Sequence, residues 1–203
     1  MKKLSVILAL IAMLFFIDAC STTRSTTGSG TGSTTGTGTG GTTDNTGATG
    51  SSRTGSTASS VNQEFVTDAA SGGMMEVELG TMAVQNASSQ EVKDFGRRMI
   101  DDHSKANDEL KSIAAKENIP VPAALKDENR DDVDKLSKLS GSDFDKEYID
   151  MMVKDHQKDI KNFEDMAQNA QSPELKQFAQ KTLPTLRQHL KMAQDIQDKM
   201  GNK

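Results

Sequence analysis

The chain contains three histidines, and each interrupts an apolar stripe of a predicted helix. In residues 99–108, "MIDDHSKAND", His103 occupies a position where the three- and four-residue spacing of apolar side chains favours leucine. His156 and His189 interrupt two other stripes in the same way, and Glu76 interrupts a fourth. Imidazole and carboxylate groups bind metals and move protons, so these four side chains are the candidates for chemistry.

The four side chains are expected to lie at similar heights in the fold. His103 and Glu76 lie about 15 and 12 residues from the first predicted hairpin turn, which is roughly 20 Å at the helical rise. His156 and His189 lie about 16 and 17 residues from the second turn, or roughly 25 Å. If the two turns lie at opposite ends of a bundle, all four groups meet near its middle.

Burying these groups without partners would cost several kcal/mol each, so they must be paired or metal-bound. We therefore predict a site for one divalent metal, either Zn, Fe, Mn or Cu. The predicted ligands are Glu76, His103, His156 and His189. Three aspartates are predicted to hydrogen-bond to the imidazoles or support them nearby: Asp102, Asp155 and Asp159. The alternative is a buried His–Glu hydrogen-bond network that fixes the register of the helices without metal.

The elements that must position these residues are all helical, because alternating strand patterns are absent and apolar residues recur at helical spacing. Four long helices are predicted at about 61–86, 89–118, 142–170 and 173–200. Ser172 is a good N-cap for the last helix, and Pro173 suits its first position. The connection 119–140 is long enough to cross a bundle, which favours a ferritin-like four-helix bundle with one long crossover over up-and-down topology.

The N-terminal segment predicts secretion and lipid anchoring. Residues 1–19 combine two lysines with a short apolar run, as a signal peptide does, and "FIDAC" resembles the lipobox of bacterial lipoproteins. Cys20, the only cysteine, is the predicted lipidation site. Residues 20–60 are rich in Ser, Thr and Gly and predict a disordered tether to the domain at 61–203. We expect attachment to the membrane through the lipid, on the periplasmic face of the outer membrane.

The composition argues against several other classes of function. The net charge of the chain is −5, and residues 1–60 carry four basic and two acidic side chains, so the domain itself carries −7. An acidic domain without a basic stripe is a poor nucleic-acid binder. The chain has no Trp and one Tyr, which also disfavours stacking on bases or sugars. No particular protein partner can be predicted from the sequence.

Four segments in order resemble the bacterial domain-of-unknown-function 4142 family, over about residues 62–197. They are "GGMMEVELGTMA", "DFGRRMIDDHSKANDELK", "LSGSDFDKEYIDMMVKDHQ" and "KTLPTLRQHLKMAQ". The resemblance implies a ferritin-like bundle in the cell envelope and supplies no biochemical activity. The polar positions that recur in the family fall here on Glu76, Asp102, His103, Asp155, His156 and His189.

The wider ferritin-like group also suggests a carboxylate-bridged di-iron centre, from which this sequence departs. That centre uses Glu-x-x-His motifs, but Ile100 and Leu186 stand three residues before His103 and His189. Inward carboxylates are expected to be too few for two irons.

We therefore expect a lipoprotein that binds metal or protects against stress rather than an enzyme. The alternative is a structural or interaction module of the envelope with a metal-free polar layer. A metal-dependent oxidoreductase would need an open coordination position, and the sequence reveals none.

Overall fold

The fold consists of four long helices and one short helix. The computed structural model describes residues 52–201, with side chains described from Ser59 onward. Its helices are α1 (Ser52–Asn86), α2 (Gln90–Glu117), α3 (Asp127–Leu136), α4 (Gly141–Asn169) and α5 (Pro173–Gly201). Within residues 52–201 no strand forms, and the only pairing of that kind is a lone bridge between Ala87 and Gly141. The prediction of an all-helical bundle is confirmed.

The spacing of apolar residues determines where these helices form and which face of each is buried. In α2 the buried side chains recur every three or four residues, from Val92 through His103 to Ile113, so one face of the helix enters the core. The ends of α2, α4 and α5 lie within one residue of the predicted bounds. Ser172 Oγ accepts a hydrogen bond from the backbone N–H of Leu175 at 3.0 Å and so caps α5 as predicted.

The first helix begins earlier than predicted. It starts at Ser52 rather than at 61, so residues 52–60, assigned to the tether, are helical. Ser, Thr and Gly are poor helix formers, but extending an established helix avoids the cost of nucleation. The predicted signal peptide, Cys20 and the rest of the tether lie outside the described residues. None of the described helices combines the length and apolar content that crossing a membrane requires.

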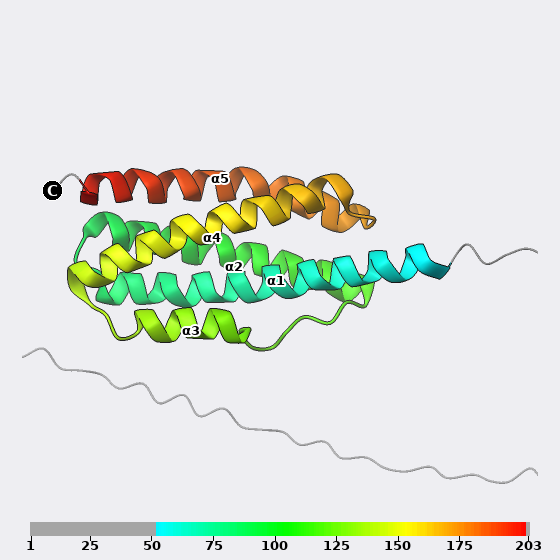
Figure 1. Cartoon of the computed structure of the whole chain (residues 1–203), viewed down its shortest axis with the longest axis horizontal. Helices are drawn as coiled ribbons and strands as arrows, with labels where there is room; N and C mark the ends of the chain where they lie inside the picture. Colours follow the sequence, from blue (N-terminus) through cyan, green and yellow to red (C-terminus); the bar gives the residue numbers. More distant parts are fainter. Residues whose placement is uncertain (1–51, 202–203) are drawn as a thin grey trace, which may run out of the picture. The chain divides into compact units, whose positions relative to one another are not determined.

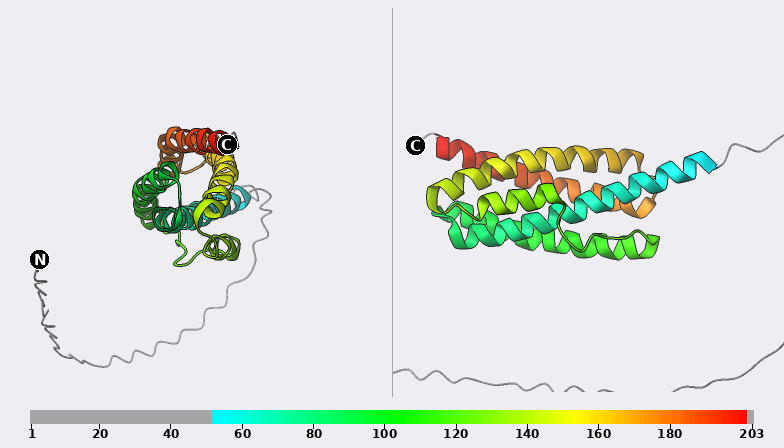
Figure 2. Two further views of the ribbon diagram at one scale, coloured as in Figure 1. Left: turned by 90° about the vertical axis from the view of Figure 1, so that its left-hand side faces the viewer. Right: turned by 60° about the horizontal axis from the view of Figure 1, so that its bottom comes forward.

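The four long helices surround a common axis as two antiparallel hairpins (Figure 2). One hairpin pairs α1 with α2 and the other pairs α4 with α5, while α2 packs on α5 and α1 packs on α4. The short helix α3 lies outside this ring, against α1 and α4 (Figures 1 and 2). The ring encloses one continuous interior that side chains from all four long helices can reach.

The two hairpin turns lie at opposite ends of the bundle, because the connection 118–140 carries the chain back along its length (Figure 1). At one end, Asp145 near the start of α4 accepts hydrogen bonds from the backbone N–H groups of Ser88 and Ser89, at 3.0 and 2.9 Å. At the other end, the Ser172 hydroxyl donates to the Glu117 carboxylate. This is the arrangement with one long crossover connection.

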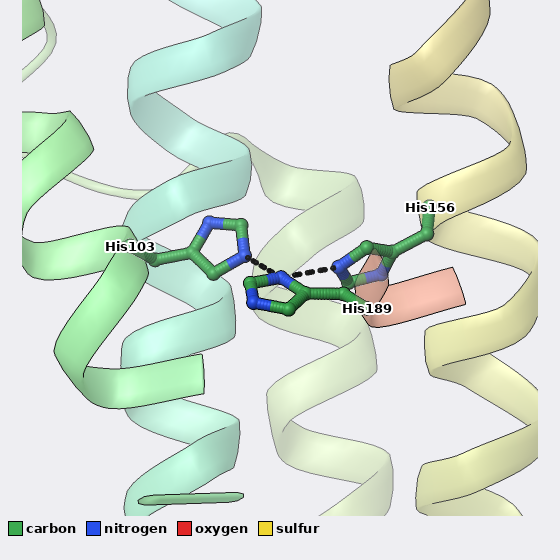
Figure 3. A group of neighbouring side chains, drawn as sticks. All are labelled: His103, His156 and His189. Atoms are coloured by element: carbon green, nitrogen blue, oxygen red, sulfur yellow. Dashed lines mark hydrogen bonds between the residues drawn. The ribbon is translucent and has the colours of Figure 1, made fainter. Parts of the chain in front are cut away.

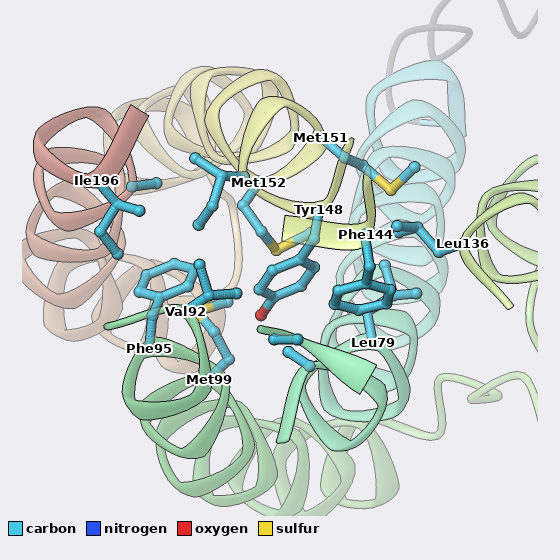
Figure 4. Packing of buried hydrophobic residues seen from close by; sticks show 14 of the residues in the cluster. Leu79, Val92, Phe95, Met99, Leu136, Phe144, Tyr148, Met151, Met152 and Ile196 are labelled. Carbon is cyan, nitrogen blue, oxygen red and sulfur yellow. The ribbon is translucent and has the colours of Figure 1, made fainter. Parts of the chain in front are cut away.

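The core consists of two apolar clusters. One surrounds Phe95, Tyr148 and Met152 toward the first turn (Figure 4), and the other surrounds Phe65 and Phe178 toward the second turn. Between them, each long helix contributes polar side chains instead of apolar ones: Glu76, His103, Asn107, His156 and His189. A buried polar layer therefore divides the core at mid-height.

Candidate metal centre

The three histidines and Glu76 meet inside this polar layer, each from a different long helix (Figure 3 draws the histidines). Glu76 comes from α1, His103 from α2, His156 from α4 and His189 from α5. His103 is 6% exposed, Glu76 1%, and the other two are fully buried. The structure thus brings together all four residues that the sequence marked as candidate ligands.

The imidazoles approach one another through one nitrogen each. His189 Nδ1 lies 3.3 Å from His103 Nε2 and 3.4 Å from His156 Nε2, the contacts drawn as dashed lines in Figure 3. One ring nitrogen from each of the three histidines lies within 4.8 Å of the other two. The imidazoles thus present one convergent nitrogen each to a common point.

The other nitrogen of each ring faces a separate hydrogen-bond acceptor. His156 Nδ1 lies 2.9 Å from the backbone carbonyl of Met152, and His189 Nε2 lies 3.0 Å from Asp102 Oδ2. His103 Nδ1 lies 2.7 Å from Glu76 Oε2. A neutral imidazole carries one proton, and donation to these acceptors leaves the three convergent nitrogens with free lone pairs.

This arrangement has the dimensions of a metal site. Nitrogens bound about 2.0–2.1 Å from a tetrahedral metal lie about 3.3–3.4 Å apart, which matches the two separations measured from His189 Nδ1. Hydrogen bonds from the outer nitrogen of each ligand to a carboxylate or carbonyl are the usual support of a histidine metal site. Because carbonyl oxygens only accept hydrogen bonds, the Met152 carbonyl fixes the tautomer of His156 outright.

Burial keeps these imidazoles neutral. It lowers the pKa of His103 and of His189 to about 4, and holds the pKa of His156 well below its ordinary value. Burial, followed by the nearby Asp155 charge, raises the pKa of Glu76 well above its ordinary value. Neutral imidazoles are the form that binds metals, and a cation here would compensate the cost of ionising Glu76.

Asp102 acts as predicted, in that it contacts an imidazole of a neighbouring helix. Burial opposes ionisation of Asp102, but hydrogen bonds from Arg98 and His189 outweigh it and lower the pKa of the carboxyl. Arg98 also lies 3.4 Å from the side-chain oxygen of Gln188 on α5. The role of Arg98 was missed in the sequence, although its spacing of four residues from Asp102 is that of a helical ion pair.

Asp155 and Asp159 do not contact the imidazoles in the predicted way. Among the described residues, neither makes a hydrogen bond or an ion pair with a histidine. Instead, their carboxylates gather with that of Glu76, with one oxygen of each within 4.8 Å of the others. Three inward carboxylates thus lie beside the imidazoles, fewer than the four of a carboxylate-bridged di-iron centre.

A small cavity adjoins the imidazoles. It has a volume of about 30 Å³ and is lined by Glu76, His103, His189, Asp159, Phe163 and Thr182, among others. This volume exceeds the roughly 10–15 Å³ that one water molecule needs. The cavity is therefore large enough to hold a water-sized ligand beside His103 and His189.

The fold and this centre define a helical bundle with a buried layer of three histidines and a glutamate. The chain matches the family model described as Domain of unknown function (DUF4142) over residues 47–196, and it belongs to that family. It is similar to the crystal structure of a DUF305 fragment from Deinococcus radiodurans, with a TM-score of 0.61. At 14% identity, covering 70% of this chain and 97% of the fragment, this likeness shows a shared fold. No curated protein matches the chain.

Proposed function

We propose that this protein is a cell-envelope lipoprotein whose bundle binds one divalent metal ion. Its role would be to hold metal in the envelope or to protect against stress. The ligands are His103 Nε2, His156 Nε2 and His189 Nδ1, with Glu76 Oε1 in position to be the fourth. The envelope location rests on the N-terminal sequence, in which Cys20 would carry the lipid that attaches the protein to the outer membrane.

The observation that carries the proposal is the convergence of three imidazole lone pairs inside the core. Their outer nitrogens already face acceptors, so a central cation would satisfy all three inner nitrogens at once. Glu76 Oε1 supports the same conclusion, because it is buried without a hydrogen-bond partner and lies 3.4 Å from His156 Nε2. An imidazole-rich site favours Zn, Cu or Fe over Mn.

The alternative is a metal-free proton chain that fixes the packing of the helices. A protonated Glu76 would donate to His103 Nδ1, His103 Nε2 would donate to His189 Nδ1, and His189 Nε2 would donate to Asp102. The three contacts, at 2.7, 3.3 and 3.0 Å in that order, are short enough for these hydrogen bonds. This arrangement of protons leaves two acceptors, His156 Nε2 and Glu76 Oε1, facing each other without a proton between them. Unsatisfied buried acceptors cost free energy, and a bound metal would remove that cost.

Metal analysis of the full chain, purified without a histidine tag, tests the proposal. After stripping with a chelator and reloading with Zn²⁺, the wild type should retain about one equivalent through gel filtration and unfold at a higher temperature than the stripped protein. Each of the single changes His103→Ala, His156→Ala and His189→Ala should abolish retention of the metal. The chain has no other histidine that could hold Zn²⁺ in their place.

The metal-free alternative predicts a different pattern. Zn²⁺ would not be retained under any loading, and the chelator would leave the unfolding temperature unchanged. His103→Ala would still destabilise the protein, because Glu76 Oε2 would lose its partner inside the core. Retention of Zn²⁺, rather than stability of the variant, therefore distinguishes the two functions.

The cavity beside His103 and His189 favours one second candidate, metal-dependent catalysis on a very small substrate. Such catalysis needs a coordination position open to that substrate. Replacement of the metal by Co²⁺ gives a visible spectrum that reports this position. If added azide changes the spectrum, the position is open, and an unchanged spectrum contradicts the catalytic candidate.

A further inference from the structure

Beside the imidazoles lies a second group of ligands that consists of oxygens alone. Glu76 on α1 faces Asp155 and Asp159 on α4, and the three carboxylates are close enough to share one ion. Asp155 and Asp159 are four residues apart, so one face of α4 presents both of them. The group lies on the side of the imidazole cluster toward α1, α3 and α4.

Two oxygens of this group are buried without partners. Asp155 Oδ2 and Glu76 Oε1 accept no hydrogen bond from any described residue. Glu76 is 1% exposed, so its carboxylate has almost no contact with bulk solvent. A buried acceptor without a donor costs free energy unless an ion or a proton satisfies it.

The protein supplies little positive charge to this group. Lys158 is the cation that acts on both Asp155 and Asp159, but its side chain is 60% exposed and also pairs with Glu128 at 3.7 Å. Lys126 pairs with Asp68 at 2.8 Å and with Glu128 at 3.3 Å. Three carboxylates thus lie close together with one exposed lysine to offset their charge, so they repel one another.

We infer that Glu76, Asp155 and Asp159 form a second cation site beside the imidazole site, in which Glu76 Oε1, the oxygen that His103 does not hold, is shared by the two cations. Its ligands are carboxylate oxygens, which suit hard divalent cations such as Mn²⁺, Mg²⁺ or Ca²⁺. The bundle would then hold two unlike cations side by side, one bound mainly by nitrogen and the other by oxygen.

The two aspartates of the second site also line a recess on the side toward α3. A small recess between α1, α3 and α4 is lined by Asp68, Gly72, Asn129, Asp155, Asp159 and Asn162, among others. A β-carbon added at Gly72 would meet Asp159 Oδ2 at 3.9 Å, so this glycine leaves room beside the carboxylate. The crossover helix α3 contributes Glu128 and Asn129 to the lining of this recess.

Mn²⁺ binding to the full chain tests this inference, followed by the loss of the electron paramagnetic resonance signal of free Mn²⁺. The protein is first stripped and loaded with one equivalent of Zn²⁺ to occupy the imidazole site. The wild type should then bind about one Mn²⁺. The double change Asp155→Asn and Asp159→Asn should weaken Mn²⁺ binding at least tenfold and leave the retained Zn²⁺ unchanged.

Two further variants complete the experiment. The matched control, Asp143→Asn with Asp165→Asn, alters the charge equally at exposed positions of α4 and should bind Mn²⁺ as the wild type does. His189→Ala removes an imidazole ligand but no carboxylate, and it retains no Zn²⁺, so its Mn²⁺ affinity is compared with that of the zinc-free wild type and should match it within about twofold. Thermal unfolding should show the Asp155/Asp159 double variant at least as stable as the metal-free wild type, because two repelling charges are gone.

The inference is overturned if the wild type binds no Mn²⁺, or if the double variant binds it as tightly as the wild type. Loss of Mn²⁺ in His189→Ala would also overturn it, because the Mn²⁺ would then occupy the imidazole site. Failure of Zn²⁺ retention with Mn²⁺ binding intact would instead count against the proposed imidazole site and leave the carboxylate site standing.

Discussion

At the scale of single residues, the centre depends on what lies behind each imidazole. Three different acceptors orient the rings: a carboxylate on α1, a backbone carbonyl on α4 and Asp102 on α2. Asp102 is itself held by Arg98, which keeps it ionised. An ionised acceptor behind His189 makes its Nδ1 a stronger metal ligand.

Replacing Asp102 tests this support. Asp102→Asn removes the charge that faces His189 Nε2, and we expect Zn²⁺ affinity to fall about 10–100-fold, as at other histidine metal sites. A competition titration with a chromophoric chelator measures the change.

The neighbouring residue provides the matched control. Asp101→Asn removes the same charge one position earlier, on the exposed face of α2. It should leave Zn²⁺ affinity within about twofold of the wild type. Equal losses in both variants would contradict a specific role of Asp102 and indicate a general charge effect.

At the scale of elements, the close approach of α1 and α2 fixes the height of Glu76 against His103. These helices meet at Gly80 and Gly96, where a β-carbon on either glycine would lie 2.8 Å from the backbone oxygen of the other. Only glycine fits at such a distance. Glu76 lies about one turn from this crossing on α1, and His103 lies about two turns from it on α2.

Gly96→Ala should therefore destabilise the protein, by about 1–3 kcal/mol, because the added carbon meets the Gly80 backbone and Ala83. Urea unfolding of the metal-free chain measures the change. Gly72→Ala is the matched control, since its β-carbon has only ordinary contacts. That variant should be stabilised by about 0.5–1 kcal/mol from helix propensity. Equal effects of the two changes would contradict the role of the close crossing.

Helical periodicity made the elements predictable, because the alternation of buried and exposed positions follows directly from 3.6 residues per turn. It also placed the histidines and Glu76 on inward faces. It could not identify the carboxylate group, because the direction of Asp155 and Asp159 depends on the register of α4 against α1. Nor could it find the Met152 carbonyl, which the sequence does not distinguish from any other. The early start of α1 was missed because Ser, Thr and Gly indicate a tether.

At the scale of the whole molecule, the crossover sets which helix ends meet. Asp145 joins the first hairpin to the start of α4 by accepting hydrogen bonds from Ser88 and Ser89. The side chain is only 4% exposed, so water replaces these bonds poorly. Spacing from the turns predicted where the four ligands lie along the axis, but the sequence could not establish that the turns lie at opposite ends.

Asp145→Ala should destabilise the protein by about 2–4 kcal/mol, because it leaves two turn N–H groups without their acceptor. Thermal or urea unfolding of the metal-free chain measures the loss. Asp143→Ala removes an exposed acidic residue from the first turn of the same helix and should cost less than about 1 kcal/mol. A small effect at Asp145 would contradict its role as the joint between the hairpins.

The central claim is that three imidazole nitrogens from three helices converge on a metal ion. Crystals of the Zn²⁺-loaded protein, measured on both sides of the zinc absorption edge, test it most directly. We predict one strong anomalous peak about 2.0–2.1 Å from His103 Nε2, His156 Nε2 and His189 Nδ1. A loaded crystal without a peak at that point, and with the imidazoles joined only to one another, would contradict the claim.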